Sequence, residues 1–284
     1  MTTKRIVRYD PNATYEIREF DLEYLNYQGE SRMVRIYQPQ GEGPFPVLLS
    51  VHGGAWSAGN HENNPVTTRP IASSGVLVAA IGLRVAPQFP YPAQVQDTNY
   101  GTRWLKQHAS EFNGDPATLG AIGYSSGGHT LPLSAMRPDD PRYNVIPLDG
   151  NADATVGWMG VCWPVIDPYV RHQISQKAGN AELSAKNLGY FLGEEAMHEA
   201  NPVEMLERGE QCSLPPALVI HGTADDNVPF ERAERFCSLY NAAGGQAQLE
   251  PFQDQPHSFG NTPGPQCDRL VEVVKGYIAN FLES

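Results

Sequence analysis

Hydrophobic residues along this chain recur at two different spacings, which predict strands and helices in turn. Residues 14–38 alternate between apolar and polar side chains and are interrupted by a turn at 28–30, so they predict an antiparallel pair of strands at a sheet edge. Further along, short and mostly apolar runs predict further strands, and a continuous apolar run such as 47–51 suits a strand buried on both faces of a parallel sheet. These runs lie at residues 47–51, 76–81, 118–123, 155–163, 216–220 and 246–252.

Helical spacing appears between several of these runs. It predicts helices at residues 91–108, 230–242 and 268–282, and Pro92 suits the first turn of the first helix. Strands that alternate with helices imply βαβ units, right-handed crossovers and a mostly parallel sheet. We therefore expect a single α/β domain over residues 1–284.

One stretch departs from this alternation. Residues 168–210 contain no clear strand but carry helical pieces at 181–192 and 194–206. A connection of this length between two strands is either a lid over the strand ends or a disordered insert. We expect a helical cap insertion at about residues 168–210.

Composition limits the classes of partner. The 284 residues are 40% hydrophobic, which is enough for a sizeable core, and no run approaches the roughly 18 apolar residues of a membrane span. The net charge of −12 argues against nucleic acid or an anionic membrane as a partner. The four cysteines form no C-x-x-C pair, and no apolar stretch follows the basic N-terminus, so we expect reduced thiols in a cytoplasmic protein.

The sequence Gly123-Tyr124-Ser125-Ser126-Gly127 follows a predicted buried strand and precedes a predicted helix start. This G-x-S-x-G spacing is typical of a nucleophilic serine held on a tight strand-to-helix turn. Glycines flank such a serine because a Cβ atom at either position would collide with the backbone. The serine is therefore the candidate nucleophile.

A nucleophilic serine needs a base within hydrogen-bonding reach, and that base needs an acid to orient it. Of the eight histidines, only His257 follows the last predicted strand and lies C-terminal to a candidate acid. That acid is Asp225, with Asp226 as a hydrogen-bonding neighbour, while Asp167 and Asp254 stay as alternatives. Each group follows a strand, and ligands of open α/β sheets gather beyond the carboxyl ends of the strands, so we expect the groups to meet at one rim.

Backbone N–H groups could stabilise an oxyanion formed on the substrate. Ser126 would supply one donor, and the loop Gly53-Gly54-Ala55 after an early strand would supply one or two more. Glycines let backbone amides approach a ligand closely, although the same residues could form a simple turn.

Other side chains near these motifs are weaker candidates. Trp56 and Tyr124 could line the substrate pocket, although Trp56 could equally be packing. His52 is expected to brace the glycine loop, and His129 to support Ser125 from one turn along the helix. Neither a metal nor another cofactor is expected, because metal-site spacing and nucleotide-binding glycine motifs are missing. The histidines without such spacing are His61, His108, His172 and His198.

Together these motifs resemble the α/β-hydrolase superfamily, specifically its hormone-sensitive-lipase-like and acetyl-esterase-like carboxylesterases. The resemblance covers nearly the whole chain from about residue 47. It rests on residues 52–56, 84–93, 123–128 and 164–168 and on the loops of Asp225 and His257. It implies an eight-stranded sheet with helical cap elements and a small-molecule ester as substrate. The site residues it implies are a Ser125–Asp225–His257 triad and an oxyanion hole from Gly53, Gly54 or Ala55 with Ser126.

Three positions depart from the family pattern. Ala55 replaces the third glycine of H-G-G-G, which could shift or narrow the oxyanion loop. Tyr124 replaces the acidic residue that often precedes the serine. Pro132 predicts a kink or an early end in the helix after Ser125.

The function expected from this sequence is hydrolysis of carboxylic esters through an acyl-enzyme on Ser125. Amide cleavage, for instance of an arylformamide, stays open because formamidases of the superfamily share an H-G-G-x-W loop. A non-catalytic ligand-sensing protein on the same scaffold is a further alternative. The acyl and alcohol specificity and the oligomeric state, with a homodimer as one option, are not fixed by the sequence.

Overall fold

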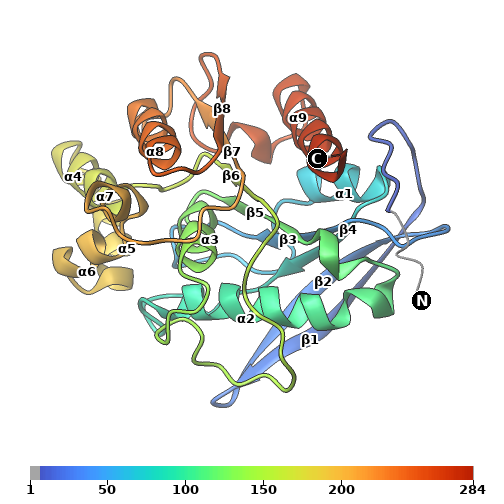
Figure 1. Ribbon diagram of the computed structural model, residues 1–284. Helices are drawn as coiled ribbons and strands as arrows, with labels where there is room; N and C mark the ends of the chain where they lie inside the picture. The colour runs from blue at the N-terminus through green and yellow to red at the C-terminus, as the bar shows by residue number, and fades with distance from the viewer. Residues whose placement is uncertain (1–6, 284) are drawn as a thin grey trace.

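Residues 7–283, which the computed structural model describes, form an eight-stranded sheet covered by helices (Figure 1). The strand order is β1-β2-β4-β3-β5-β6-β7-β8. β1 (Ile17–Tyr27) and β2 (Glu30–Pro39) form an antiparallel pair at one edge, and β2 also runs antiparallel to β4 (Leu77–Ile81). The expected edge pair and the α/β fold are confirmed.

The strands from β3 to β8 run parallel to one another. Every residue of β3, β4, β5, β6 and β7 is buried, which explains why these segments are mostly apolar. β6 is shorter than the predicted run at 155–163. The bounds of the parallel strands not yet given are β3 (Val47–Val51), β5 (Gly120–Tyr124), β6 (Met159–Cys162), β7 (Ala217–Gly222) and β8 (Ala247–Phe252).

Two apolar clusters lie on opposite faces of the sheet, because successive side chains of each strand point to alternate sides. The larger cluster includes residues of α2 (Ala93–His108), α3 (Gly127–Met136) and α8 (Phe230–Ala242). The other includes residues of α1 (Pro65–Ser73) and α9 (Pro265–Glu283), which lie side by side in Figure 1. The helices predicted at 91–108, 230–242 and 268–282 are confirmed.

α3 does not end at Pro132, as the sequence allowed, but continues to Met136. The helix is buried along its whole length, so tertiary packing holds the turn in which proline lacks its N–H donor.

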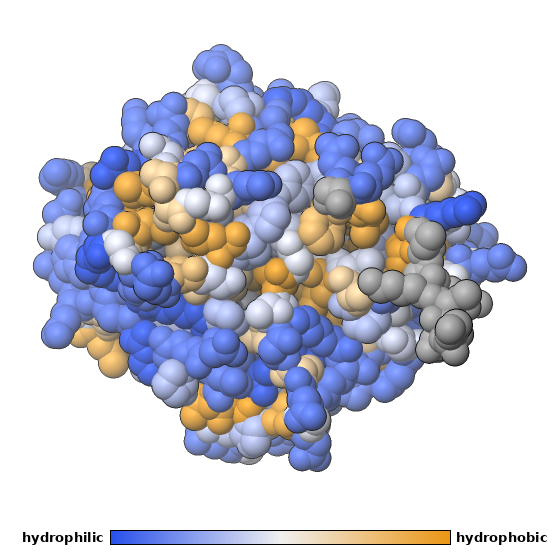
Figure 2. Space-filling model, viewed as in Figure 1, coloured by the Kyte–Doolittle hydropathy of each residue, from blue (hydrophilic) through white to orange (hydrophobic). Residues whose placement is uncertain are grey.

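The surface is mainly hydrophilic on the face shown in Figure 2, with smaller hydrophobic patches between the hydrophilic residues. Among the described residues, the large apolar side chains that are exposed are Val145, Leu188 and Leu192. Within residues 7–283 we find no helix with the length and apolar character needed to cross a membrane.

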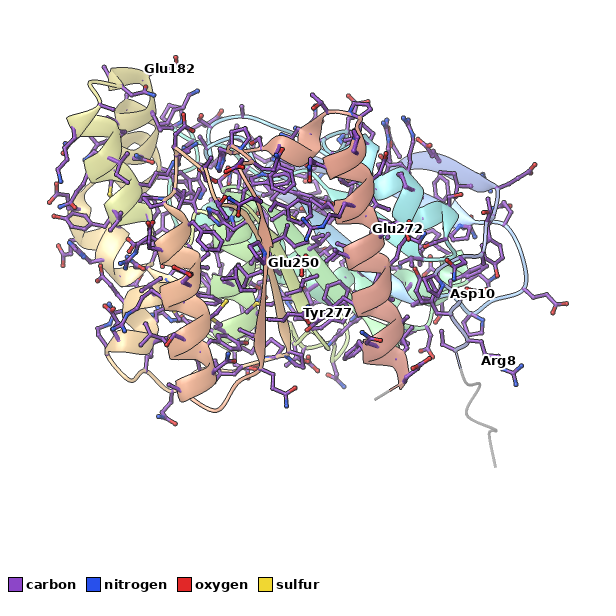
Figure 3. The ribbon with its side chains drawn as sticks, turned by 90° about the horizontal axis from the view of Figure 1, so that it is seen from above. Arg8, Asp10, Glu182, Glu250, Glu272 and Tyr277 are labelled. Atoms are coloured by element: carbon purple, nitrogen blue, oxygen red, sulfur yellow. The ribbon has the colours of Figure 1, made fainter. Side chains whose placement is uncertain are left out.

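Between β6 and β7 the chain forms four short helices beside α8, namely α4 (Pro168–Lys177), α5 (Ala181–Phe191), α6 (Glu194–Glu199) and α7 (Pro202–Glu207). The helical piece expected at 194–206 is two helices, because the Asn201 side chain accepts the N–H groups of Val203 and Glu204 and starts a new helix. Seen from above, Glu182 on α5 lies at the outer edge of the molecule (Figure 3). The segment is helical rather than irregular.

Candidate active site

Ser125 lies on the turn between β5 and α3. Its φ of 51° is left-handed, a conformation that side chains other than glycine rarely adopt. A Cβ on Gly123 would lie 2.4 Å from the carbonyl oxygen of Gly127, and a Cβ on Gly127 would lie 2.3 Å from that of Val51. Both distances are too short for non-bonded atoms, so the two glycines are what allow the turn to close.

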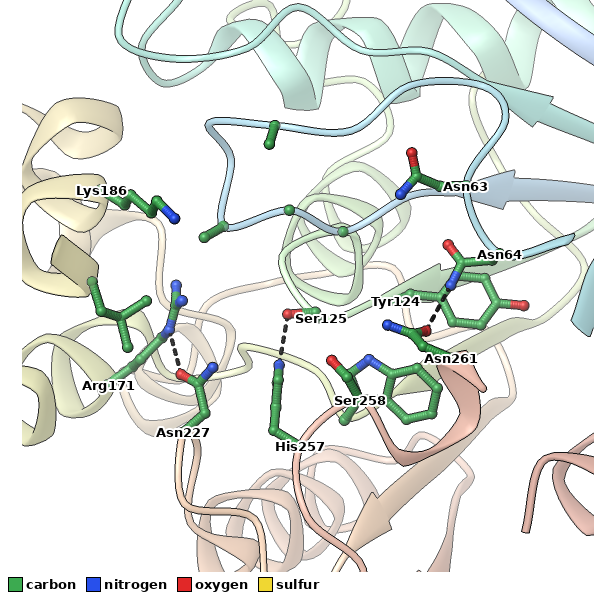
Figure 4. A pocket seen from close by; sticks show the side chains of 16 residues that line it. Asn63, Asn64, Tyr124, Ser125, Arg171, Lys186, Asn227, His257, Ser258 and Asn261 are labelled. Atoms are coloured by element: carbon green, nitrogen blue, oxygen red, sulfur yellow. Dashed lines mark hydrogen bonds between the residues drawn. The ribbon is translucent and has the colours of Figure 1, made fainter. Parts of the chain in front are cut away.

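The structure brings Ser125, His257 and Asp225 together from loops that follow β5, β8 and β7. Figure 4 shows the contact between Ser125 and His257. The Ser125 Oγ lies 2.8 Å from His257 Nε2, and His257 Nδ1 lies 2.8 Å from Asp225 Oδ2. Both distances are within hydrogen-bonding range. The imidazole therefore bridges a hydroxyl and a carboxylate, as a proton relay requires.

The Asp225 carboxylate is buried and surrounded by donors. Its Oδ1 accepts the backbone N–H groups of Asn227 and Val228, both at 2.9 Å, and its Oδ2 faces His221 Nε2 at 3.2 Å as well as His257. Burial alone would raise the pKa of this carboxyl, but the hydrogen bonds from His221, His257 and the backbone hold the pKa well below its ordinary value. Asp225 is therefore ionised beside the imidazole.

The other acids considered for this position lie elsewhere. Asp226 is exposed, and it makes no hydrogen bond to the described residues, so the expectation that it is a hydrogen-bonding neighbour of the site is wrong. Asp167 accepts the Val170 N–H at the start of α4. Asp254 accepts from Gln253 on the loop after β8.

The loop after β3 lies against the serine turn. A Cβ on Gly53 would lie 2.7 Å from the Tyr124 carbonyl oxygen, and the next residues have positive φ, 120° at Gly54 and 51° at Ala55. Within residues 7–283, the N–H groups of Gly54, Ala55 and Ser126 have no acceptor. These three amides are free to donate to a ligand oxygen. Ala55 adopts the left-handed conformation although it replaces a glycine of the family pattern.

Trp56 is buried packing and does not line the pocket, so its candidacy as a substrate-binding residue is not supported. Its N–H donates to Ser126 Oγ at 3.2 Å, and its indole N–H donates to His129 Nδ1, also at 3.2 Å. Its ring stacks on Tyr190 of α5, with ring centres 5.0 Å apart. The ring therefore joins the glycine loop, α3 and α5.

Two buried histidines brace this arrangement as neutral rings. His52 donates from Nδ1 to the Gly53 carbonyl at 2.6 Å and accepts the Leu83 N–H at Nε2. His129 donates from Nε2 to the Ala200 carbonyl at 2.7 Å. Burial lowers the pKa of each ring to about 4. The expected bracing role of His52 fits these contacts.

A cavity of about 370 Å³ opens at Ser125, large enough for a small organic molecule. Ser125, His257 and the 53–55 loop line it, as does Tyr124, whose hydroxyl points away to bond with Thr67. The sequence did not reveal the remaining lining residues, which come largely from the segment between β6 and β7 and from the loops near α1 and after β8. These residues are Ala58, Asn63, Asn64, Trp163, Arg171, Leu183, Lys186, Asn227, Ser258 and Asn261.

One group of potential metal ligands occurs among the described residues. Asp21, His61 and Glu62 lie close together, but outside the pocket. The Arg35 guanidinium already pairs with Asp21 at 2.8 Å and with Glu62 at 2.9 Å. The Arg35 guanidinium thus supplies positive charge to the two carboxylates of this group.

The BD-FAE family model matches residues 34–239, nearly three quarters of the chain. The chain belongs to the BD-FAE family. This membership agrees with the resemblance to α/β-hydrolases that the motifs at residues 52–56 and 123–128 carry. The matched region contains the serine turn and Asp225 but ends before His257.

Curated relatives of this BD-FAE chain include two mycobacterial proteins. A probable carboxylic ester hydrolase of Mycobacterium tuberculosis, LipM, is 28% identical over 79% of this chain and 49% of its own length. Esterase LipC of the same organism is 29% identical over 81% of this chain and 57% of its own length. The chain thus spans about half the length of these relatives.

Solved esterase structures share the fold. A hyperthermophilic esterase from Pyrobaculum calidifontis superposes with a TM-score of 0.77 at 22% identity, covering 96% of this chain and 86% of its own. Esterase 2 of Thermogutta terrifontis, phosphoramylated by tabun, gives a TM-score of 0.70 at 23% identity, with 92% and 94% covered. The α/β-hydrolase fold expected from the sequence is confirmed.

Proposed function

We propose that this protein is a serine hydrolase that cleaves carboxylic esters through an acyl-enzyme on Ser125. The observation that carries the proposal is the continuous hydrogen-bonded relay from the Ser125 hydroxyl through His257 to the ionised Asp225. Family membership and the esterases among its relatives support the choice of ester over other acyl compounds.

In the proposed reaction, Ser125 Oγ attacks the ester carbonyl while His257 Nε2 takes the hydroxyl proton. In this proposal the N–H groups of Gly54, Ala55 and Ser126 hold the resulting oxyanion. Their lack of an acceptor among the described residues supports this role. Collapse of the tetrahedral intermediate breaks the ester C–O bond, and the leaving alcohol receives the proton from His257.

The second half of the reaction repeats these roles with water. His257 takes a proton from water as the water oxygen attacks the acyl carbonyl, and returns it to Ser125 Oγ when the carboxylic acid leaves. Asp225 keeps the imidazole in the tautomer that presents Nε2 to the serine and stabilises the imidazolium. No net change of protonation occurs at the enzyme over the cycle.

We also infer that residues 168–210 act as a cap on this pocket within one domain. Arg171 of α4 and Leu183 and Lys186 of α5 line the same cavity as Ser125, which supports this assignment. The cap would then set which acyl and alcohol groups fit.

Hydrolysis of 4-nitrophenyl acetate tests the proposal. Ser125→Ala should lower kcat by about a million-fold, and Asp225→Asn by about ten-thousand-fold, since each breaks the relay. A fluorophosphonate should label the wild type once and leave Ser125→Ala unlabelled. Ser110→Ala, an exposed serine with no side-chain hydrogen bond to the described residues, is the matched control and should keep wild-type turnover. An active Ser125→Ala enzyme would refute the mechanism.

A further inference from the structure

The charge of the pocket is opposite to that of the protein. The chain has 32 acidic and 20 basic residues, for a net charge of −12. Yet the sixteen residues that line the cavity at Ser125 include no aspartate or glutamate. They do include Arg171 and Lys186, on two neighbouring cap helices. The cavity is therefore a cationic site in an acidic protein.

Arg171 is a buried cation without a carboxylate partner. Its side chain is 1% exposed, its Nε donates to Asn227 Oδ1 at 2.8 Å, and its Nη1 donates to Asn187 Oδ1 at 3.1 Å. The guanidinium also lies 5.0 Å from the Trp56 ring centre. These neighbours are neutral, so they solvate the charge without cancelling it.

Nη2 of Arg171 makes no hydrogen bond to any residue in 7–283, although Arg171 lines the cavity. Asp225 attracts the guanidinium from a distance, but its own oxygens are occupied by His257, His221 and backbone donors. Burial lowers the pKa of Arg171 to about 9, which leaves the group charged at neutral pH. A buried charge is costly unless it is paired, so this site favours an anion from outside the chain.

Lys186 adds a second positive charge. Its Nζ pairs with Glu182 at 2.7 Å, but the Glu182 side chain is 80% exposed and lies at the outer edge of the molecule (Figure 3). An exposed pair of this kind holds its partners weakly. In Figure 4 the ends of Lys186 and Arg171 reach into the same side of the pocket, facing the space beside Ser125.

We propose that Arg171 and Lys186 bind an anionic group of the substrate, so that the preferred substrates are esters bearing a carboxylate or phosphate near the scissile carbonyl. This inference rests on the proposed serine-hydrolase function and names its substrate class. The planar guanidinium suits the two oxygens of a carboxylate, and the ammonium adds a mobile point charge. Binding of the anion would also hold the ester against Ser125.

Two matched pairs of esters test the charge preference. The 4-nitrophenyl monoester of adipic acid and its methyl ester share the leaving group and place the charge, or its neutral replacement, on the acyl side. 4-Acetoxybenzoate and its methyl ester place it on the leaving group. In at least one of the two pairs, we expect kcat/KM for the anionic ester to exceed that for its methyl ester about tenfold or more, mainly because its KM is lower. The preference should shrink as salt is added.

Variants identify the residues responsible. Arg171→Gln and Lys186→Gln should each reduce the ratio of anionic to neutral kcat/KM several-fold. Lys177→Gln, which removes an exposed lysine of α4 outside the pocket, should leave the ratio unchanged. Lys186 is partly exposed, so its variant tests the inference even if the Arg171 variant fails to fold.

The outcomes separate the two proposals. If the neutral esters are cleaved and the anionic ones are no better in either pair, the anionic-substrate inference is wrong and the serine hydrolase stands. A wild-type preference that survives both substitutions would overturn the assignment to Arg171 and Lys186. If no ester of either pair is cleaved, the proposed function itself fails, and the substrate class fails with it.

Discussion

The buried rings of His52 and His129 make the fold sensitive to acid. Each ring both donates and accepts a hydrogen bond: His52 accepts the Leu83 N–H, and His129 accepts the indole N–H of Trp56. A proton added to the accepting nitrogen would set two donors against each other in a buried site. The folded state therefore resists protonation, whereas the unfolded state does not.

The size of this effect follows from the pKa values. Burial lowers each pKa from 6.5 to about 4, so the unfolded chain binds more protons between these two values. The stability that neutral rings contribute is complete above pH 6.5 and is lost as the pH falls toward 4. When the pH is lowered from about 7.5 to about 4.5, each ring should reduce the free energy of unfolding by about 2.5 kcal/mol. Two rings together account for about 5 kcal/mol, comparable to the whole stability of a small domain.

Urea denaturation followed by tryptophan fluorescence at the two pH values measures this loss. His129→Gln keeps a donor and an acceptor but cannot take up a proton, so its stability should fall between the two pH values by about 2.5 kcal/mol less than that of the wild type. Its stability at the higher pH can differ from the wild type without affecting this comparison. Gln176→Ala, at an exposed position of α4 that carries no titratable group, is the control and should lose as much stability as the wild type. An equal loss in His129→Gln and the wild type would refute the reasoning.

Two further predictions concern packing. Tyr190→Phe should leave the free energy of unfolding unchanged or raise it by up to about 1 kcal/mol, because the buried Tyr190 hydroxyl has no partner in residues 7–283. Tyr240→Phe should lower the free energy of unfolding by about 1–2 kcal/mol, because the Tyr240 hydroxyl donates to the Pro215 carbonyl at 2.6 Å. If the two variants change the free energy of unfolding equally in urea denaturation, both expectations are wrong. Gly127→Ala should destabilise the protein by several kcal/mol, because its Cβ would lie 2.3 and 2.4 Å from two backbone oxygens. Gly276→Ala, which meets nothing within 4 Å on α9, should be neutral or stabilising, and a well-folded Gly127→Ala protein would refute the steric argument.

The sheet could be predicted from the sequence because strands that are buried on both faces are mostly apolar along their length. Residues 47–51 illustrate this, since each of them is buried in β3. α1 gave no comparable signal. It contains Pro65 and Pro70, and two of its buried residues are Thr67 and Thr68, so neither propensity nor hydrophobic spacing marked it as a helix. Its position against α9 is set by tertiary packing.

The same limit applies to the candidate site. The proximity of Ser125, Asp225 and His257 could be predicted because each follows a strand, and the sheet then brings the strand ends together. The sequence could not decide whether Trp56 faces substrate or packing, because the ring that covers it, Tyr190, lies more than a hundred residues away. Arg171 was missed for the same reason, because its place in the pocket depends on how α4 and α5 pack.

The glycine loop at residues 53–55 and the neighbouring Trp56 are held in place by contacts to α3 and α5. Gly54, Ala55 and Trp56 all have positive φ, and for the two residues that carry a Cβ this conformation costs about 1–3 kcal/mol each. The conformation persists because buried groups hold it: Trp56 bonds to Ser126 and His129 and stacks on Tyr190. Tyr190 belongs to α5, the helix that also carries Lys186 into the pocket. A shift of α5 would therefore disturb both the free amides beside Ser125 and the positive charge proposed to receive the substrate.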